Sequence, residues 1–123
     1  MKIRIKGNSL RLRLTKTEVD TFCSTGYFTE ETRLPNGTFT YTLAIKEDID
    51  AMDALLQQNG VTLYISKELV TDWATDDRVG FQHALPLEND TTLSLLVEKD
   101  FVCMDQRIED QSDNYPNPKL EGR

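Results

Sequence analysis

Apolar and polar side chains alternate at the start of the sequence, in two short runs. Two isoleucines alternate with charged residues over 2–6, and three leucines do so over 9–14. Because successive side chains of a strand point to opposite faces, each run predicts a strand with one apolar face. Gly7 and Asn8 lie between the runs and favour a two-residue turn. The pattern therefore predicts a β-hairpin over these residues.

The alternation ends at Thr15, where the spacing of apolar residues becomes helical. Thr15 and Glu18 have the spacing of a capping box, in which each side chain accepts a hydrogen bond from the backbone of the other residue. Val19 and Phe22 then fall on one face of a helix, and Gly26 is typical of a helix end. We therefore expect a helix between Thr15 and Gly26.

Two β-forming segments complete the first half of the sequence. Residues 27–33 and 38–46 are rich in threonine and aromatic residues, which favour strands. Between them, Pro35 and the pair Asn36-Gly37 favour a tight turn. The first half therefore predicts the order strand, strand, helix, strand, strand.

The second half of the sequence repeats the first. A shift of 51 residues lays 1–24 over 52–75 without a gap, and five of the 24 pairs are identical. Apolar residues of 61–65 then match the leucines of the first hairpin, and Trp73 matches Phe22. A second cap, Ser66, corresponds to Thr15 in this alignment. A repeat of this length indicates an internal duplication.

The alignment extends beyond the helix. Leu34-Pro35 matches Leu85-Pro86 at the same shift, and after one inserted residue 43–48 match 95–100. We therefore expect a second pair of strands at the end of the repeat, the first of them over 80–84.

The repeat also decides one ambiguous segment. Residues 49–58 have helical propensity on their own, but their counterpart is the first strand of the sequence. Asn59-Gly60, which follows, is a strong hairpin turn signal. We therefore expect a strand over 53–57 that leads into a strand over 61–65.

These elements predict one α+β domain built by duplication of a ββαββ unit. The domain spans 1–104, with repeats over 1–51 and 52–104, and a chain of this length is too short for two separate cores. We expect a mostly antiparallel sheet or an open eight-stranded barrel, with two helices packed against it. Residues 105–123 are acidic and contain proline and asparagine, which predicts a tail.

Charge is distributed unevenly between the two ends of the sequence. Residues 1–16 hold six basic residues and no acidic residue, whereas the remainder holds eight basic against 21 acidic residues, a net of −13. The overall net charge of −7 argues against nucleic acid as a partner, because phosphate contacts need a basic surface.

Composition also indicates a location. The sequence lacks the long apolar run of a membrane span, and its first residues lack the continuous apolar stretch of a signal peptide. Cys23 and Cys103 are the only cysteines, and we expect free thiols rather than a disulfide between them. We therefore expect no membrane partner and a cytoplasmic location.

The most informative candidate site is the first hairpin. Its polar face carries five cations, which repel one another unless an anion lies nearby. These residues are Lys2, Arg4, Lys6, Arg11 and Arg13. The anion is expected to be a small, phosphate-containing ligand or an acidic protein surface, bound by arginine forks in particular. The second hairpin has Gln57, Thr62 and Tyr64 in place of Lys6, Arg11 and Arg13, so the duplicated fold itself does not require the charges.

The alternative is neutralisation of this face within the chain. The candidate acidic residues are Glu47, Glu98, Asp100, Glu109, Asp110 and Asp113. If they lie over the hairpin, the cations are structural and no ligand is needed.

Enzymatic and metal-binding signals are weak throughout the sequence. His83 is the only histidine, and we expect it to be a half-buried polar residue of a strand. The acidic residues from Asp105 to Asp113 do not have the spacing of an EF-hand loop. We expect core packing for Cys23, and Cys103 has no activating neighbour. We therefore assign no catalytic residue, no metal ligand and no cofactor.

Three segments resemble a family of short bacterial proteins of unknown function. They are the opening Met1-Lys2-Ile3-Arg4-Ile5-Lys6-Gly7-Asn8-Ser9-Leu10-Arg11, the segment Val97-Glu98-Lys99-Asp100-Phe101-x-Cys103, and the acidic ending with Tyr115-Pro116-Asn117-Pro118. The resemblance covers nearly the whole chain and implies no activity.

The order of elements is also similar to the triphosphate-tunnel fold of adenylate-cyclase and thiamine-triphosphatase relatives. That resemblance implies a wide antiparallel barrel that binds triphosphates through interior basic side chains. The Glu-x-Glu-x-Lys of that family is Lys2-x-Arg4-x-Lys6 here, so only the last position agrees. Loss of both carboxylates removes the metal clamp of phosphoryl transfer.

Three functions remain open from the sequence. The preferred hypothesis is a non-enzymatic binding or accessory module that uses the basic hairpin. The first alternative is a degenerate phosphohydrolase of the tunnel type, and the second is a structural or assembly protein.

Overall fold

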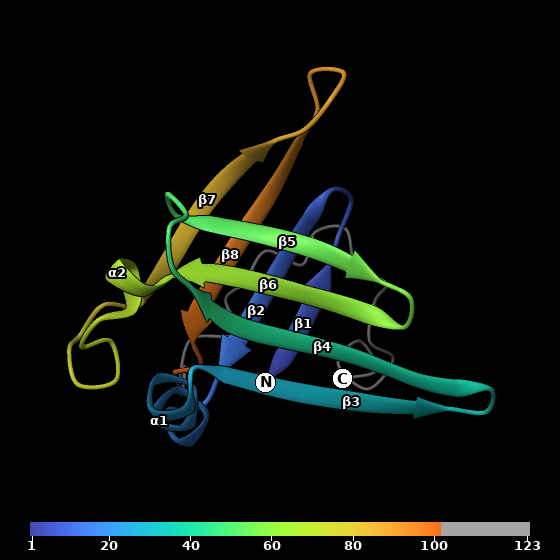
Figure 1. Cartoon of the computed structure of the whole chain (residues 1–123). Helices are drawn as coiled ribbons and strands as arrows, with labels where there is room; N and C mark the ends of the chain where they lie inside the picture. The colour runs from blue at the N-terminus through green and yellow to red at the C-terminus, as the bar shows by residue number, and fades with distance from the viewer. Residues whose placement is uncertain (102–123) are drawn as a thin grey trace, which may run out of the picture.

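The computed structural model describes residues 1–101, which form two four-stranded sheets and two helices (Figure 1). The elements are β1 (Lys2–Ile5), β2 (Ser9–Leu14), α1 (Lys16–Thr25), β3 (Tyr27–Leu34), β4 (Gly37–Lys46), β5 (Met52–Gln57), β6 (Gly60–Ser66), α2 (Lys67–Val70), β7 (Gly80–Pro86) and β8 (Thr92–Lys99). The fold is therefore α+β with the expected order of elements. The predicted strand around 53–57 is confirmed as β5, despite its helical propensity.

Each sheet combines hairpins from both halves of the chain. Sheet A has the order β1-β2-β8-β7, and sheet B has the order β3-β4-β6-β5. Pairing is antiparallel within each hairpin and parallel where two hairpins meet, at β2–β8 and at β4–β6. The strands β1 to β4 of the first repeat correspond in order to β5 to β8 of the second. Replacing each strand of sheet A by its counterpart gives β5-β6-β4-β3, which is the order of sheet B read from its other edge. This relationship fits the predicted duplication, with the two copies interleaved.

The eight strands do not close into a barrel. Of the two architectures expected from the sequence, the sheet arrangement is present, as two separate layers. The closed antiparallel barrel implied by the tunnel resemblance is absent from the described residues, because each sheet has free edge strands and a parallel central pair.

The strand pairing corrects the sequence alignment in the last hairpin. Leu12 and Leu63 hold equivalent positions in the two parallel ladders, and their partners are Val97 and Leu43. The sequence alignment instead placed Leu43 over Leu95, two positions earlier. Extra residues between Val70 and β7 account for the offset, because α2 is short and a loop replaces the rest of the helix.

The core fills the space between the two sheets. Its aromatic centre is Trp73, which lies 6.4 Å from Phe22 and 5.1 Å from Phe81 between ring centroids, in edge-to-face geometry. The buried apolar residues are Met1, Leu12, Leu14, Val19, Phe22, Tyr41, Leu43, Met52, Leu63, Ile65, Val70, Trp73, Leu95 and Val97. The pairing of Phe22 with Trp73 places the equivalent residues of the two repeats in contact.

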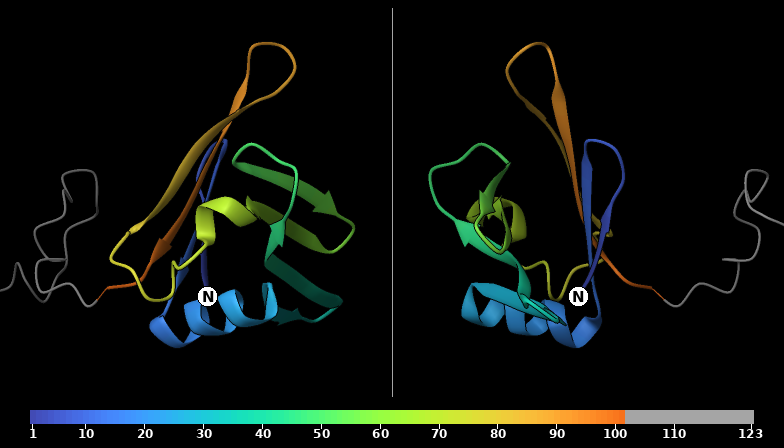
Figure 2. Two further views of the ribbon diagram at one scale, coloured as in Figure 1. Left: turned by 60° about the vertical axis from the view of Figure 1, so that its left-hand side comes forward. Right: turned by 90° about the vertical axis from the view of Figure 1, so that its right-hand side faces the viewer.

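The first helix lies across one end of the layers, and the β1–β2 and β7–β8 turns point away from it (Figure 2). Thr15 caps α1, and the capping box with Glu18 is present as expected. Gly26 ends the helix with a left-handed conformation (φ 92°), which favours glycine. Over residues 1–101, no helix is long and apolar enough to cross a membrane.

Candidate functional site

The five predicted cations lie together on the outer face of sheet A. Lys2 pairs with Arg13 across the β1–β2 ladder, and Arg4 pairs with Arg11. Lys6 follows β1 at the turn, where its N–H donates to the carbonyl of Ser9 at 3.3 Å. The side chains therefore share one face because the strand alternates, with Leu12 and Leu14 buried on the other face. We call these five residues the basic face.

One carboxylate neutralises two of the arginines. Glu98 lies opposite Arg13 in the parallel β2–β8 ladder, and its Oε1 accepts hydrogen bonds from Nε and Nη2 of Arg13 at 3.1 and 2.9 Å. The same oxygen lies 3.1 Å from Nε of Arg11. The Glu98 side chain is only 16% exposed, so solvent screens these contacts less than it would at an open surface.

Lys2, beside Arg13 at the same end of the basic face, is also paired. Nζ of Lys2 lies 3.3 Å from Oδ2 of Asp100. Glu47, another acidic residue considered from the sequence, pairs instead with Lys67 at 3.7 Å, so it does not neutralise the basic face. The remaining candidates, Glu109, Asp110 and Asp113, lie outside the described residues, as do Asp105 and Cys103.

Arg4 and Lys6 differ from their neighbours. Both side chains are exposed, and within residues 1–101 neither forms an ion pair. They border a hollow of about 210 Å³ that is also lined by Ser9, Arg11, Gln82 and Ser94. A second hollow of about 300 Å³ adjoins it, lined by Lys2, Ile3, Arg4, Arg11 and Arg13. The concavity on the outer surface of sheet A is thus lined by the cations Arg4 and Lys6, unpaired within residues 1–101, by Arg11, which also contacts Glu98, and by neutral hydrogen-bonding groups.

Sheet B has the same strand plan without this charge. The positions equivalent to Arg4 and Lys6 are Leu55 and Gln57, and the Gln57 side chain accepts a hydrogen bond from Oγ1 of Thr62 at 2.9 Å. The difference is chemical rather than architectural, since both hairpins pair antiparallel in the same way. The charge on sheet A therefore belongs to the hairpin's sequence and not to the needs of the fold.

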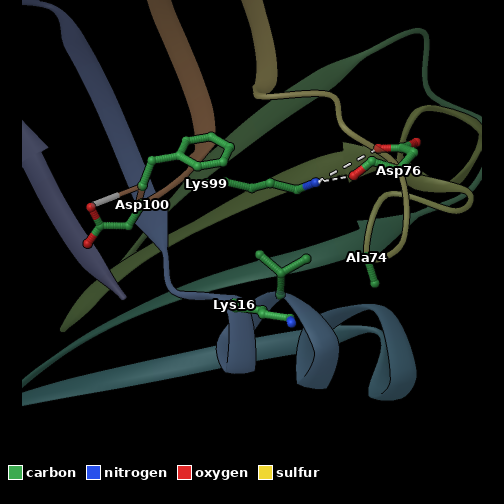
Figure 3. A pocket seen from close by; sticks show the side chains of 7 residues that line it. Lys16, Ala74, Asp76, Lys99 and Asp100 are labelled. Atoms are coloured by element: carbon green, nitrogen blue, oxygen red, sulfur yellow. Dashed lines mark hydrogen bonds and ion pairs between the residues drawn. The ribbon is translucent and has the colours of Figure 1, made fainter. Parts of the chain in front are cut away.

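Figure 3 shows another hollow, of about 310 Å³, beside the start of α1. Lys99 and Asp100 are consecutive and point in opposite directions. Nζ of Lys99 donates to the backbone carbonyl of Asp76 at 2.7 Å and lies 5.6 Å from the centre of the Trp73 ring. Because Asp100 pairs with Lys2, the charges around this hollow are mostly satisfied within the described part of the chain. It is a weaker anion site than the basic face.

A third charged cluster lies between the sheets and has a structural role. The α-ammonium group of Met1 pairs with the carboxylates of Glu18 and Glu30, and the hydroxyl of Tyr41 donates to the Met1 carbonyl at 2.9 Å. Burial acts to raise the pKa of Glu18, but hydrogen bonds from the Met1 ammonium group and Thr15 together hold it below its ordinary value. Burial raises the pKa of Tyr41, with the charges of Glu30 and Glu18 adding to the effect.

The remaining candidate residues do not form a reactive site. Burial raises the pKa of the Cys23 thiol, which opposes formation of the reactive thiolate. Cys23 packs against the core as expected, and His83 is half-buried on β7, also as expected. Over residues 1–101, no group of three His, Cys, Asp or Glu residues could hold a metal ion. The concavity beside Arg4 and Lys6 also lacks a carboxylate in its lining.

Sequence reasoning missed one feature, a hollow of about 490 Å³ between the two sheets. Ile5, Leu10, Leu56 and Leu93 border it, and the sequence pattern does not show that these residues gather around one hollow. The exposed Leu56 is the one signal in the sequence, because it follows Leu55 directly and so puts leucines on both faces of one strand. The position of the hollow depends on how the sheets diverge, which periodicity does not encode.

Comparison with models of known protein families gives a match over most of the chain. The model of a family described as a family of unknown function, DUF7009, matches residues 1–119. Neither the curated proteins nor the solved structures contain a match to the chain. The geometry of the site is therefore the main guide to function.

Proposed function

The chain belongs to DUF7009, a family of unknown function, and from its own site we propose that it is a non-enzymatic binding module for a small anion. The ligand site is the concavity on the outer face of sheet A beside Arg4 and Lys6. The ligand class is a phosphate-containing anion, because its oxygens accept hydrogen bonds from guanidinium and ammonium groups.

One observation carries this proposal. Glu98 and Asp100 pair with Arg11, Arg13 and Lys2, and they leave Arg4 and Lys6 without an acidic partner among residues 1–101. Arg4 lies directly opposite Arg11, an arrangement in which like charges on neighbouring strands repel. A bound anion beside Arg4 and Lys6 would relieve this repulsion, because no carboxylate of residues 1–101 pairs with these two side chains.

The lining of the concavity supports binding rather than chemistry. Gln82 and Ser94 add neutral hydrogen-bonding groups to the cations. Phosphoryl transfer would need a metal clamp or a group that activates water. Lys2 and Arg4 of β1, and Lys6 directly after it, stand at the positions where the tunnel enzymes have two carboxylates and a lysine. Phosphohydrolysis is therefore the less favoured function.

The size of the site favours a small ligand over an acidic protein surface. A volume of about 210 Å³ suits an inorganic or organic phosphate, whereas a protein partner usually covers a much larger and flatter area. We further propose that the module works in the cytoplasm of a bacterium. The free thiol of Cys23 supports this location.

Calorimetric titration with phosphate, pyrophosphate, triphosphate and ATP tests the proposal. We expect binding that weakens between 50 and 200 mM salt, because ion pairs dominate it. The double variant Arg4→Ala/Lys6→Ala should lose about tenfold or more in affinity, since charged hydrogen bonds contribute roughly 1.5–3 kcal/mol each. Lys16→Ala and Arg33→Ala serve as controls, because they remove exposed charges elsewhere.

Each outcome separates the candidate functions. Binding that the double variant abolishes supports the module. Turnover of a triphosphate with Mg²⁺ or Mn²⁺ supports the phosphohydrolase instead. A chain that responds to none of the anions overturns the proposal and favours a structural or assembly role.

A further inference from the structure

An apolar cleft opens between the two sheets beside the outer concavity. It lies among the β1–β2, β5–β6 and β7–β8 turns and has a volume of about 490 Å³. Its apolar lining includes Ile5, Leu10, Phe39, Leu56, Leu87 and Leu93. We call this hollow the inter-sheet cleft. Its volume falls within the range typical of small-molecule sites, roughly 300–1,000 Å³.

The polar groups at the cleft are already hydrogen-bonded. Nδ2 of Asn8 donates to the carbonyl of Thr92 at 2.8 Å, and Oγ of Ser9 donates to the carbonyl of Lys6 at 2.6 Å. Water in the cleft therefore finds few partners, and apolar walls hold it weakly. The chemistry of the lining favours an apolar occupant.

Several apolar side chains at the mouth are uncovered. Leu56 is 85% exposed, Ile5 is 60% exposed and Leu87 is 44% exposed. Exposed apolar side chains that gather in one place commonly mark a binding surface. An occupant that covers them would gain from removing their surface from water.

The cleft and the basic face meet at the β1–β2 turn. Ser9 and Leu10 line both the inter-sheet cleft and the concavity beside Arg4 and Lys6. Lys6 directly follows Ile5, so a cation and an apolar wall residue are neighbours in the chain. An apolar chain that leaves the cleft at this turn would end beside positive charge. This charge complementarity selects one kind of occupant.

We propose that the inter-sheet cleft binds the alkyl chain of an anionic amphiphile, whose head group is held by Lys6 and Arg4. This inference rests on the proposed function and names its ligand class. The head group occupies the anion site, and the alkyl chain passes over the β1–β2 turn into the cleft. A concave site suits a single slim chain better than it suits a second protein surface.

Calorimetric titration with octanoate, decanoate and dodecanoate tests this ligand class, below the concentrations at which each forms micelles. We expect affinity to rise up to about fourfold per added methylene, the increment for burying one CH₂ group. Acetate and 1-decanol serve as the head group alone and the neutral chain alone. Both should bind much more weakly than decanoate.

Two matched pairs of variants locate the ligand. Leu56→Gln should weaken decanoate binding at least fivefold, whereas Leu55→Gln should not, because these adjacent exposed residues lie on opposite faces of β5. Lys6→Ala should weaken decanoate and pyrophosphate binding together, whereas Lys16→Ala should change neither. Because Leu56 is so exposed, its substitution should leave the fold intact, which thermal unfolding verifies.

The outcomes distinguish this inference from the proposed function. If pyrophosphate binds but decanoate binds no better than acetate, the amphiphile proposal is overturned and the anion module remains. If decanoate binds equally well to Lys6→Ala and Arg4→Ala, the role of the head group is overturned. Sedimentation that shows a dimer broken by Leu56→Gln, without decanoate binding, would assign the cleft to a second copy of the chain.

Discussion

Arg13 and Glu98 stand at the same position of the parallel β2–β8 ladder and are joined by two hydrogen bonds to one carboxylate oxygen. That oxygen also contacts Arg11, so one carboxylate on β8 forms ion pairs with two arginines on β2. The contact joins a strand of the first repeat to a strand of the second, and it reduces the net positive charge of the basic face.

The first prediction concerns Glu98→Gln. Removing this carboxylate frees Arg11 and Arg13, so we expect pyrophosphate affinity to rise several-fold and its salt dependence to steepen. We also expect the free energy of unfolding to fall by about 1 kcal/mol, since the ion pairs are partly buried. Calorimetry at two salt concentrations and urea unfolding measure the two effects.

Glu47→Gln provides the control for Glu98→Gln. Glu47 is exposed and pairs with Lys67, away from the basic face, so neither quantity should change appreciably. Unchanged or weaker pyrophosphate binding in Glu98→Gln would mean that Arg11 and Arg13 do not take part in the anion site.

The second prediction concerns acid stability and Glu18. The folded-state pKa of Glu18 lies below its ordinary value of 4.5, despite burial, because hydrogen bonds from Met1 and Thr15 stabilise the carboxylate. A lowered pKa contributes stability that is fully present above the ordinary value and is lost as pH falls through the folded value. We expect Glu18→Gln to lower the unfolding free energy by about 1–2 kcal/mol at neutral pH.

The same reasoning fixes the pH profile of that difference. The gap between wild type and Glu18→Gln should stay constant down to about pH 5 and close below it. Denaturant unfolding from pH 7 to 2.5 measures the gap, and Glu31→Gln on the exposed face of β3 serves as a control. A gap of constant size at all these pH values would contradict the assigned cause.

Much of the fold follows from periodicity in the sequence. Alternation predicted β1 and β2, and the capping pattern at Thr15 and Glu18 predicted α1. The duplication predicted β5 where local propensity favours a helix, because tertiary pairing with β6 outweighs a weak intrinsic preference. The alternation and the capping box depend only on residues near one another in the chain, and the duplication repeats such local patterns. They can therefore be recognised in a single sequence.

The errors and omissions involve relationships between distant segments. Leu43 was aligned with Leu95 instead of Val97, and the sequence pattern did not reveal the error, because a shift of two residues keeps the same face of the strand buried. The five cations were predicted to share a face. The β1–β2 register places four of them so, and Lys6 lines the same hollow as Arg4 and Arg11. Which acidic residue pairs with them could not be predicted, because Glu98 meets Arg13 only through the parallel joining of the two repeats.

The third prediction concerns the buried hydroxyl of Tyr41. It donates to the carbonyl of Met1, so Tyr41→Phe should leave a buried acceptor without a partner. We expect the free energy of unfolding to fall by about 1–2 kcal/mol in urea titrations. Tyr64→Phe removes a hydroxyl from a half-buried ring on the outer face of β6 and should change stability by less than about 0.5 kcal/mol. Equal losses in both variants would contradict a specific role for the Tyr41 hydrogen bond.

The fourth prediction concerns Arg78, which holds the loop that replaces most of the second helix. Its guanidinium donates to the carbonyls of Leu69 and Thr71 and to the carboxylate of Asp76, each at 2.7 Å. The hydrogen bond from Arg78 is also the main reason that the pKa of Asp76 lies below its ordinary value. Arg78→Ala should therefore release the loop and lower the unfolding free energy by about 1–3 kcal/mol.

Hydrogen exchange distinguishes release of the loop from general destabilisation. In Arg78→Ala, the amides of Trp73, Thr75 and Asp76 should exchange faster, because their hydrogen bonds to Val70 and Asp72 depend on the loop conformation. Amides in α1 should keep their protection under native conditions. Arg33→Ala on β3 should alter neither region, and uniform loss of protection across both sheets in Arg78→Ala would show that the arginine supports the whole core instead.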